Sequence, residues 1–479
     1  MYRVALEDAV PRNTALMLRF LIGLLSAALL VLAWMRITAL EPVREDGFLP
    51  IEPPTPYIRY IPDIEPRTRV LVVHGLNANK EFMQILCAAL ADSGFEVYNI
   101  DLPGHGDSPA GFNGVLARRT LEQAVSRLNP GAAIGHSLGA GLLLDLAHDV
   151  HFRALVLISP APTPIDNVDL QHTLVTTGRW DIPAVNSFVP RLQGAEWRQY
   201  KWGMHSSAPL NPVQIRDIVH WLGGETTRLR TGSRMAWLGL MFSTAFVLGI
   251  TLLPRRPAQR VSAAFSAKDV ILAFILACGI AIVVLRFFLV LRSIRLFATD
   301  YLVSFLFVAG LVLMAVAVSR KDSLLSLLKG RPGHSIAIAV AVAAAVYVIL
   351  IIGLLTGSHL IHMTVSDGRW WRCPVIAAAT FPLFLFDEIA TRQVGNGWEN
   401  AALGILTRAL LAASTATGVL ILNRHDSFLV LILGLIVLFW TALWLCTEII
   451  SRRVQNPIAA ALFAALVQGW MFAAWFVTV

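Results

Sequence analysis

The chain has 479 residues, of which 56% are hydrophobic and 15% are charged, and its mean hydropathy is +0.64. This composition excludes an ordinary soluble protein and indicates an integral membrane protein. The net charge of +8 does not gather into basic clusters interleaved with stacking aromatic residues, so we expect no nucleic-acid partner. The four cysteines lie far apart and suggest neither a disulfide framework nor a metal site, and we expect no metal and no cofactor.

The first predicted element is a membrane span near the start of the chain. Residues 15–34 are apolar over the length that a spanning helix needs, and no cleavage site follows them. We therefore predict an N-terminal tail and an uncleaved transmembrane anchor over residues 1–36. A polar, proline-rich linker is expected over residues 37–56.

Residues 57–225 have soluble character and alternate between strands and helices. Apolar strands are predicted within RVLVVHG, which ends in a turn, within FEVYNIDLPGHGDS, which ends in a loop, and at GAAIGHS and RALVLISP, and helices are predicted between them. Buried strands joined by helices indicate a mostly parallel sheet with helices on both faces. The active sites of such sheets lie at the carboxyl ends of the strands.

The sequence GHSLG lies between the third of these strands and a helix. Gly135 and Gly139 flank Ser137, and a sharp turn there would force the serine backbone into a strained conformation that only small neighbours tolerate. The alternative is a simple strand-to-helix turn whose serine caps the helix.

Five segments resemble the α/β-hydrolase superfamily, namely VVHGLN, DLPGHGDS, GHSLG, LVTTGRWDIP and GMHSSAPLNPVQIRDIVHWL. In that family they correspond to the oxyanion loop, the turn after the next strand, the nucleophile elbow, the loop with the acid, and the histidine loop with its final helix. The resemblance implies an α/β-hydrolase fold and a serine hydrolase of the esterase or lipase type, and the order Ser, Asp, His is that of the family. Only about 20 residues separate LVLISP from the candidate acid, so we expect a nearly lidless domain.

The chemistry of ester hydrolysis assigns the candidate roles. A serine hydroxyl needs a histidine to take its proton, and the histidine needs a carboxylate that fixes its tautomer. We predict Ser137 as the nucleophile and His205 as the base, because His205 lies in a loop whereas His220 lies within the following helix.

Asp181 is the predicted acid, since it follows an apolar strand at the end that faces the site. Asp166 and Asp169 are the alternatives, because some family members carry the acid after the preceding strand. The resemblance also assigns the oxyanion hole to the backbone amides of Leu76 and Leu138. The nucleophile elbow is completed by Gly135, His136 and Gly139.

Apolar segments return in the second half, where we predict a membrane domain of about eight transmembrane helices over residues 234–479. The expected spans are 235–253, 270–291, 301–319, 335–356, 373–386, 402–422, 427–449 and 457–477. Lys and Arg are more numerous in the loops expected on the side of the N-terminus, which places the hydrolase-like domain outside the cytoplasm, on the periplasmic side of the inner membrane in a bacterium. The arginines beside the domain argue the other way, namely Arg36, Arg228, Arg230 and Arg234.

Ionisable residues at membrane depth are costly and need partners. We expect Arg408 to form a structural ion pair with an acidic neighbour at similar depth, among Asp387, Glu388 and Glu448. The segment HLIHMTVSDGRWWRC is interpreted as an interfacial anchor, with a headgroup-binding rim or a metal site as alternatives.

The expected function is that of a membrane-embedded serine hydrolase that cleaves an ester bond in a membrane lipid or lipid-linked substrate through an acyl-enzyme intermediate. The expected partners are this substrate and the bilayer. A nearly lidless site has little surface for an acyl chain, so we expect the membrane half to hold or present the apolar part of the substrate. Two alternatives remain: a transporter or scaffold with a hydrolase-like binding domain, and an acyltransferase that uses the same three residues.

Overall fold

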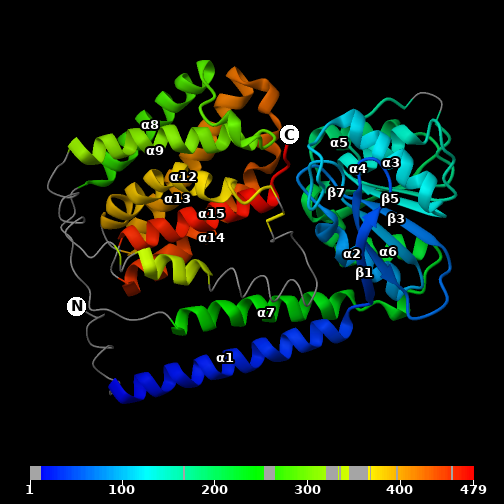
Figure 1. Ribbon diagram of the computed structural model, residues 1–479, viewed down its shortest axis with the longest axis horizontal. Helices are drawn as coiled ribbons and strands as arrows, with labels where there is room; N and C mark the ends of the chain where they lie inside the picture. Colours follow the sequence, from blue (N-terminus) through cyan, green and yellow to red (C-terminus); the bar gives the residue numbers. More distant parts are fainter. Residues whose placement is uncertain are drawn as a thin grey trace.

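An α/β domain and a group of long helices lie beside each other in the computed structural model (Figure 1). The structure describes residues 12–165, 168–252, 265–319, 333, 336–344, 365–366, 368–394, 397–454 and 457–479. The α/β domain follows the first long helix in the chain and precedes the second, so both of its ends connect directly to long helices.

One eight-stranded sheet forms the centre of the α/β domain, with the order β1-β2-β4-β3-β5-β6-β7-β8. The strands are β1 Val43–Leu49, β2 Thr55–Ile61, β3 Arg69–Val73, β4 Glu96–Ile100, β5 Ala132–His136, β6 Leu155–Ile158, β7 Thr173–Trp180 and β8 Glu196–Met204. The strands from β4 to β8 in this order pair in parallel, whereas β1 and β2 are antiparallel at one edge. The predicted mostly parallel sheet is confirmed.

Helices cover both faces of the sheet because alternate residues of each buried strand point to opposite faces. The helices of the α/β domain are α2 Gln84–Asp92, α3 Gly114–Leu128, α4 Leu138–Leu146, α5 Pro183–Phe188 and α6 Pro212–Trp221. Val70 and Val72 of β3 pack in one apolar cluster with α2 and α6, and Leu71 and Val73 pack in another with α3 and α4. The carboxyl ends of the parallel strands therefore stay open for a site.

The structure differs from the expected linker over residues 37–56. The first helix continues to Leu40, and residues 43–49 form β1, which pairs along its whole length with β2. Glu45 of β1 bonds Arg59 of β2 across this pair at 2.9 Å. An edge strand with one solvated face carries polar residues, so the sequence of β1 lacks the apolar run that marks a buried strand.

Eight long helices in the described part of the chain overlap the predicted spans. They are α1 Arg12–Leu40, α7 Thr231–Leu252, α8 Ala267–Phe287, α9 Thr299–Ser319, α12 Arg372–Ile389, α13 Gly397–Thr417, α14 Phe428–Val454 and α15 Pro457–Trp475. Six segments are long and apolar enough to cross a membrane, and they overlap α1, α8, α9, α13, α14 and α15. α7 and α12 lie at two further expected spans without meeting that measure, and most of the expected span 335–356 lies outside the described residues.

α1 and α7 lie side by side and meet the α/β domain at the same end (Figure 1). Arg234 near the start of α7 is fully buried there. Its guanidinium forms a two-pronged ion pair with Asp92 at 2.7 and 2.9 Å and donates to the carbonyl oxygen of Leu40. This arginine, which the sequence suggested only as a loop charge, therefore ties both helices to the end of α2.

Buried charges inside the helix bundle pair with one another. Arg408 pairs with Asp387, as expected for a structural ion pair. Glu388 and Glu448 instead pair with Arg392, whose Nε lies 2.6 Å from the Glu388 carboxylate. These contacts favour a structural role for the charges.

Candidate active site

The three predicted catalytic side chains each follow a parallel strand. Ser137 comes directly after β5, Asp181 after β7 and His205 after β8. Because the carboxyl ends of parallel strands lie at the same edge of a sheet, this topology brings together residues that are up to 68 positions apart in the sequence.

The side chains of Ser137, His205 and Asp181 form one hydrogen-bonded chain. His205 Nδ1 lies 2.7 Å from Asp181 Oδ1, and His205 Nε2 lies 2.9 Å from Ser137 Oγ. With its Nδ1 proton directed at the carboxylate, the imidazole presents the Nε2 lone pair to the serine hydroxyl. The arrangement can take a proton from Ser137 and hold the resulting positive charge beside a carboxylate.

The backbone at Ser137 has the strained conformation that the GHSLG pattern predicts, with φ of 51° and ψ of −112°. Its flanking glycines are required by close packing. A Cβ atom at Gly135 would lie 2.5 Å from the Ala140 nitrogen, and one at Gly139 would lie 2.6 Å from the Val73 carbonyl oxygen. The turn thus places the serine side chain at the carboxyl ends of the parallel strands.

Asp181 is held by more than the histidine. Ser159 Oγ donates to its Oδ2 at 2.5 Å, and the Ile182 amide donates to its Oδ1 at 2.8 Å. Burial alone would raise the pKa of Asp181, but the hydrogen bonds from His205 and Ser159 outweigh it and the pKa is lowered. Asp181 is therefore the charged partner that the imidazole needs. Sequence reasoning missed Ser159, which follows β6 and is marked by no motif.

The two alternative acids do not share this position. Asp169 is exposed, and its Oδ1 accepts a hydrogen bond from the nearby Gln171 amide. Asp166 lies outside the described residues. Asp181 is thus the described candidate that reaches His205.

His136 of the nucleophile elbow contacts the main chain of the base, His205. Its Nε2 donates to the backbone carbonyl of His205 at 3.0 Å. Burial, with the neighbouring His205 as a lesser cause, lowers the pKa of His136 to about 3, so its ring stays neutral. A neutral ring at this place contributes shape and one hydrogen bond without competing for the serine proton.

The amide of Leu76 lies in the turn after β3, and Leu138 directly follows Ser137. Leu138 is the first residue of α4, so its N–H has no acceptor within the helix. The turn after β3 that contains Leu76 passes close to the nucleophile, since a Cβ atom at Gly75 would lie 2.9 Å from Ser137 Cβ. Among the residues that the structure describes, neither amide donates to another protein group. Both N–H groups are therefore free to donate to an oxyanion.

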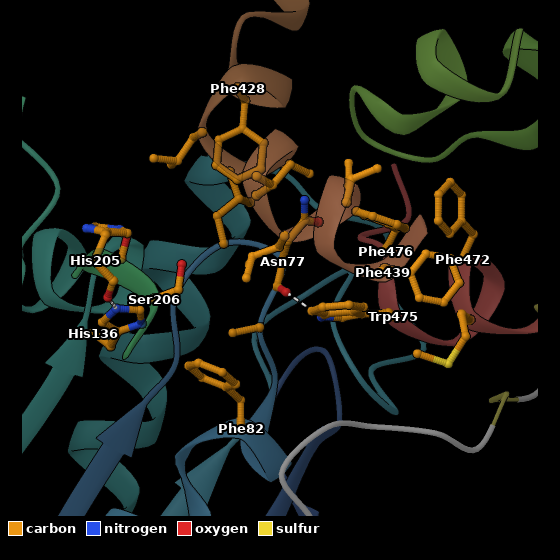
Figure 2. Close-up of a pocket in the computed structure, with 18 residues that line it drawn as sticks. Asn77, Phe82, His136, His205, Ser206, Phe428, Phe439, Phe472, Trp475 and Phe476 are labelled. Carbon is orange, nitrogen blue, oxygen red and sulfur yellow. Dashed lines mark hydrogen bonds between the residues drawn. The ribbon is translucent and has the colours of Figure 1, made fainter. Parts of the chain in front are cut away.

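A pocket opens at Ser137, between the α/β domain and the helix bundle. Figure 2 shows part of its lining, with His136 and His205 from the α/β domain and Phe428 and Trp475 from the helices. Ten of its eighteen lining residues come from α14, α15 and the residue after α15: Phe428, Leu431, Ile432, Leu435, Ile436, Phe439, Met471, Phe472, Trp475 and Phe476. Its polar lining comes from the α/β domain: Asn77, His136, Ser137, His205 and Ser206. The pocket thus joins the side chains that can react with an ester to an apolar surface that can hold an acyl chain.

The described residues contain no group of three His, Cys, Asp or Glu side chains placed to hold a metal ion. Of the segment HLIHMTVSDGRWWRC, His359, His362 and Asp367 lie outside the described residues. Its Arg369 is buried and donates to the Gly104 carbonyl at 2.9 Å, in the turn after β4 of the α/β domain.

Residues 70–277 match the model of the Alpha/beta hydrolase family. A solved monoacylglycerol lipase from Paleococcus ferrophilus is 19% identical over 36% of this chain and 98% of its own, with a TM-score of 0.30. An esterase from Pyrococcus furiosus is 17% identical over 39% and 94%, with a TM-score of 0.34, and a bacterial membrane phospholipase A is 14% identical over 47% and 98%, with a TM-score of 0.33. No curated protein sequence matches the chain. The α/β domain has the α/β-hydrolase fold, and the chain joins it to a region of long apolar helices.

Proposed function

We propose that this α/β-hydrolase chain is a membrane-embedded serine hydrolase that cleaves an ester bond in a lipid or lipid-linked substrate. The observation that carries the proposal is the shared pocket, in which the Ser137–His205 pair faces an apolar wall formed by α14 and α15. A soluble ester would not need that wall.

Acylation of Ser137 is the first half of the proposed reaction. His205 Nε2 accepts the hydroxyl proton while Ser137 Oγ attacks the ester carbonyl carbon, and Asp181 stabilises the imidazolium. The carbonyl oxygen becomes an oxyanion that accepts hydrogen bonds from the amides of Leu76 and Leu138. His205 then gives its proton to the departing alcohol, and the acyl group stays on Ser137.

Deacylation reverses these roles with water as the nucleophile. His205 accepts a proton from the water, whose oxygen attacks the acyl carbon, and the proton passes to Ser137 Oγ as the carboxylic acid leaves. The donors at the oxyanion are used a second time. The chain needs no cofactor for either half.

The apolar wall supplies the surface that the α/β domain lacks. In the described part of the segment between β6 and β7 no helix covers the site. Each methylene that moves from water to an apolar wall contributes about 0.8 kcal/mol. A long acyl chain along α14 and α15 would therefore bind far more tightly than a short one, which is the reason for assigning a lipid.

We place the α/β domain on the periplasmic side of a bacterial inner membrane. In support, the N-terminal end of α1 and the α/β domain lie at opposite ends of that helix (Figure 1). The loops expected on the side of the N-terminus also carry more Lys and Arg.

Labelling with a fluorophosphonate tests the proposal. The wild-type protein in detergent should be labelled, and Ser137→Ala should abolish the label. Ser93→Ala is the matched control, since Ser93 is a buried serine that bonds the Ala89 carbonyl within its own helix turn. An unlabelled wild type would favour a transporter or scaffold with a binding domain. Labelling of the wild type, together with transfer of the acyl group of an ester to an added alcohol in preference to water by the unlabelled enzyme, would favour an acyltransferase.

A further inference from the structure

We infer that Trp475 and Val477 of the helix bundle are positioning residues for the oxyanion loop of the α/β domain. This inference rests on the proposed function, because it concerns the donors that the hydrolytic reaction would use. It makes the docked bundle a condition for efficient turnover, in addition to its part in holding the substrate.

Two hydrogen bonds carry the inference. Trp475 Nε1 donates to the backbone carbonyl of Asn77 at 3.0 Å, as Figure 2 shows, and the Val477 amide donates to Asn77 Oδ1 at 3.1 Å. Asn77 directly follows Leu76, the residue whose amide is the proposed oxyanion donor. The bundle therefore holds the main chain and the side chain of the next residue.

Asn77 is a residue whose conformation needs such support. Its φ is 56°, in the left-handed region that Asn tolerates better than most residues, and its side chain is buried. The loop is held at its other end as well, because the Lys80 amide donates to Asp101 Oδ1 at 2.8 Å and its ammonium lies 2.7 Å from Asp101 Oδ2. The peptide units between these anchors have little freedom.

The chain segment that carries the Val477 donor is itself fixed. The Phe297 amide donates to the Val477 carbonyl at 2.8 Å, and the next residue, Thr478, exchanges backbone hydrogen bonds with Gly104 and Phe112 of the α/β domain at 3.0 and 2.7 Å. Val477 is fully buried. Residues 475–478 thus form a rigid contact between the bundle and the loops beside the nucleophile.

Preorganised donors stabilise an oxyanion because they do not have to move as the charge develops. Releasing Asn77 would let the Leu76 amide move, which weakens the transition state more than the bound ester. A positioning role therefore lowers kcat on esters of every chain length. If Trp475 only lined the acyl pocket, its loss would raise KM for long esters and leave short esters unaffected.

The variant that separates these roles is Trp475→Phe, which keeps an aromatic ring in the pocket and removes the N–H donor. We expect kcat on a p-nitrophenyl butyrate substrate to fall about tenfold, with KM within a factor of two. An alkyl boronic acid, which forms a tetrahedral adduct with the serine, should bind more weakly by a similar factor. Asn77→Gly, which keeps the left-handed backbone and removes Oδ1, should shift both measurements in the same direction.

Trp440→Phe is the matched control. Trp440 lies in α14, its Nε1 donates to Gln468 Oε1 at 3.0 Å inside the bundle, and it is not among the residues that line the pocket at Ser137. This control loses the same kind of donor and should keep the wild-type kcat and boronic acid affinity. Wild-type values in Trp475→Phe, or a change in KM alone, would overturn the inference while leaving the proposed function intact. A wild-type protein that hydrolyses no ester would instead refute the proposed function itself.

Discussion

Shortening one side chain of the apolar wall should change which esters are hydrolysed. Leu435 of α14 lines the pocket and is 37% exposed in the absence of substrate. Leu435→Ala removes three carbon atoms from the wall, which would be worth about 2 kcal/mol at full contact with an acyl chain. Because one acyl chain would touch only part of the side chain, we expect a loss of about 1 kcal/mol.

This loss corresponds to about a fivefold lower kcat/KM on a long ester. The assay compares p-nitrophenyl palmitate with p-nitrophenyl butyrate in the same mixed micelles. The butyrate chain has few methylenes to place on the wall, so its kcat/KM should stay within a factor of two.

Leu438→Ala is the control on the same helix. Leu438 is 66% exposed and is not among the pocket residues, so its truncation should leave both esters unchanged. Equal losses on the long and the short ester in Leu435→Ala, or an equal loss of palmitate hydrolysis in Leu438→Ala, would refute the acyl-wall reasoning.

Ser137→Ala or His205→Ala should lower turnover at least a thousandfold in a protein that still folds, as its circular dichroism would show, and retention of a tenth of the activity would exclude that residue from the mechanism. Because the pKa of Asp181 lies below its ordinary 3.8 in the folded protein, its contribution to the unfolding free energy is present above that pH and is lost as the pH falls through the folded pKa. Asp181→Asn should remove this acid-dependent loss in melting curves, and an unchanged acid slope would contradict the assignment. Arg234→Ala should cost about 3–5 kcal/mol in denaturant titrations because it leaves a buried aspartate unpaired, so a loss below 1 kcal/mol would count against the buried ion pair. A cysteine at the exposed position Asp46 should react with an impermeant thiol reagent in intact cells once the native cysteines are removed, whereas protection would place the α/β domain in the cytoplasm.

The local parts of the fold could be predicted from the sequence. β3 and β5 are continuous apolar runs that end in glycine-containing turns, and the conformation of Ser137 follows from the two glycines that flank it. Each of these features depends on residues within a few positions of one another. Short-range sterics and burial are therefore enough to predict them.

The edge strands β1 and β8 could not be predicted from the sequence. β1 is mostly exposed or half-buried, and β8 carries exposed residues on both faces, so neither shows the alternation or the apolar run that marks a strand. Their pairing depends on a neighbour that already lies in the sheet. The tertiary structure, and not local propensity, decides it.

The contribution of the bundle to the site also could not be located from the sequence. A general expectation that the membrane half holds the apolar substrate did follow from the short segment between β6 and Asp181. The contacts themselves join Asn77 to Trp475 across 398 positions, and their residue types are ordinary for a membrane helix and a loop. Only packing brings α14 and α15 beside Ser137.

The most direct test of the central claim is to trap the acyl-enzyme on a long-chain substrate. Full-length protein in micelles is mixed with a palmitoyl ester, quenched with acid within the first turnover and digested, and the mass of the peptide that contains Ser137 is measured. The account predicts a peptide heavier by one palmitoyl group, which is absent in His205→Ala and much reduced in Leu435→Ala. A palmitoyl adduct on another residue, or hydrolysis without any adduct at Ser137, would contradict it.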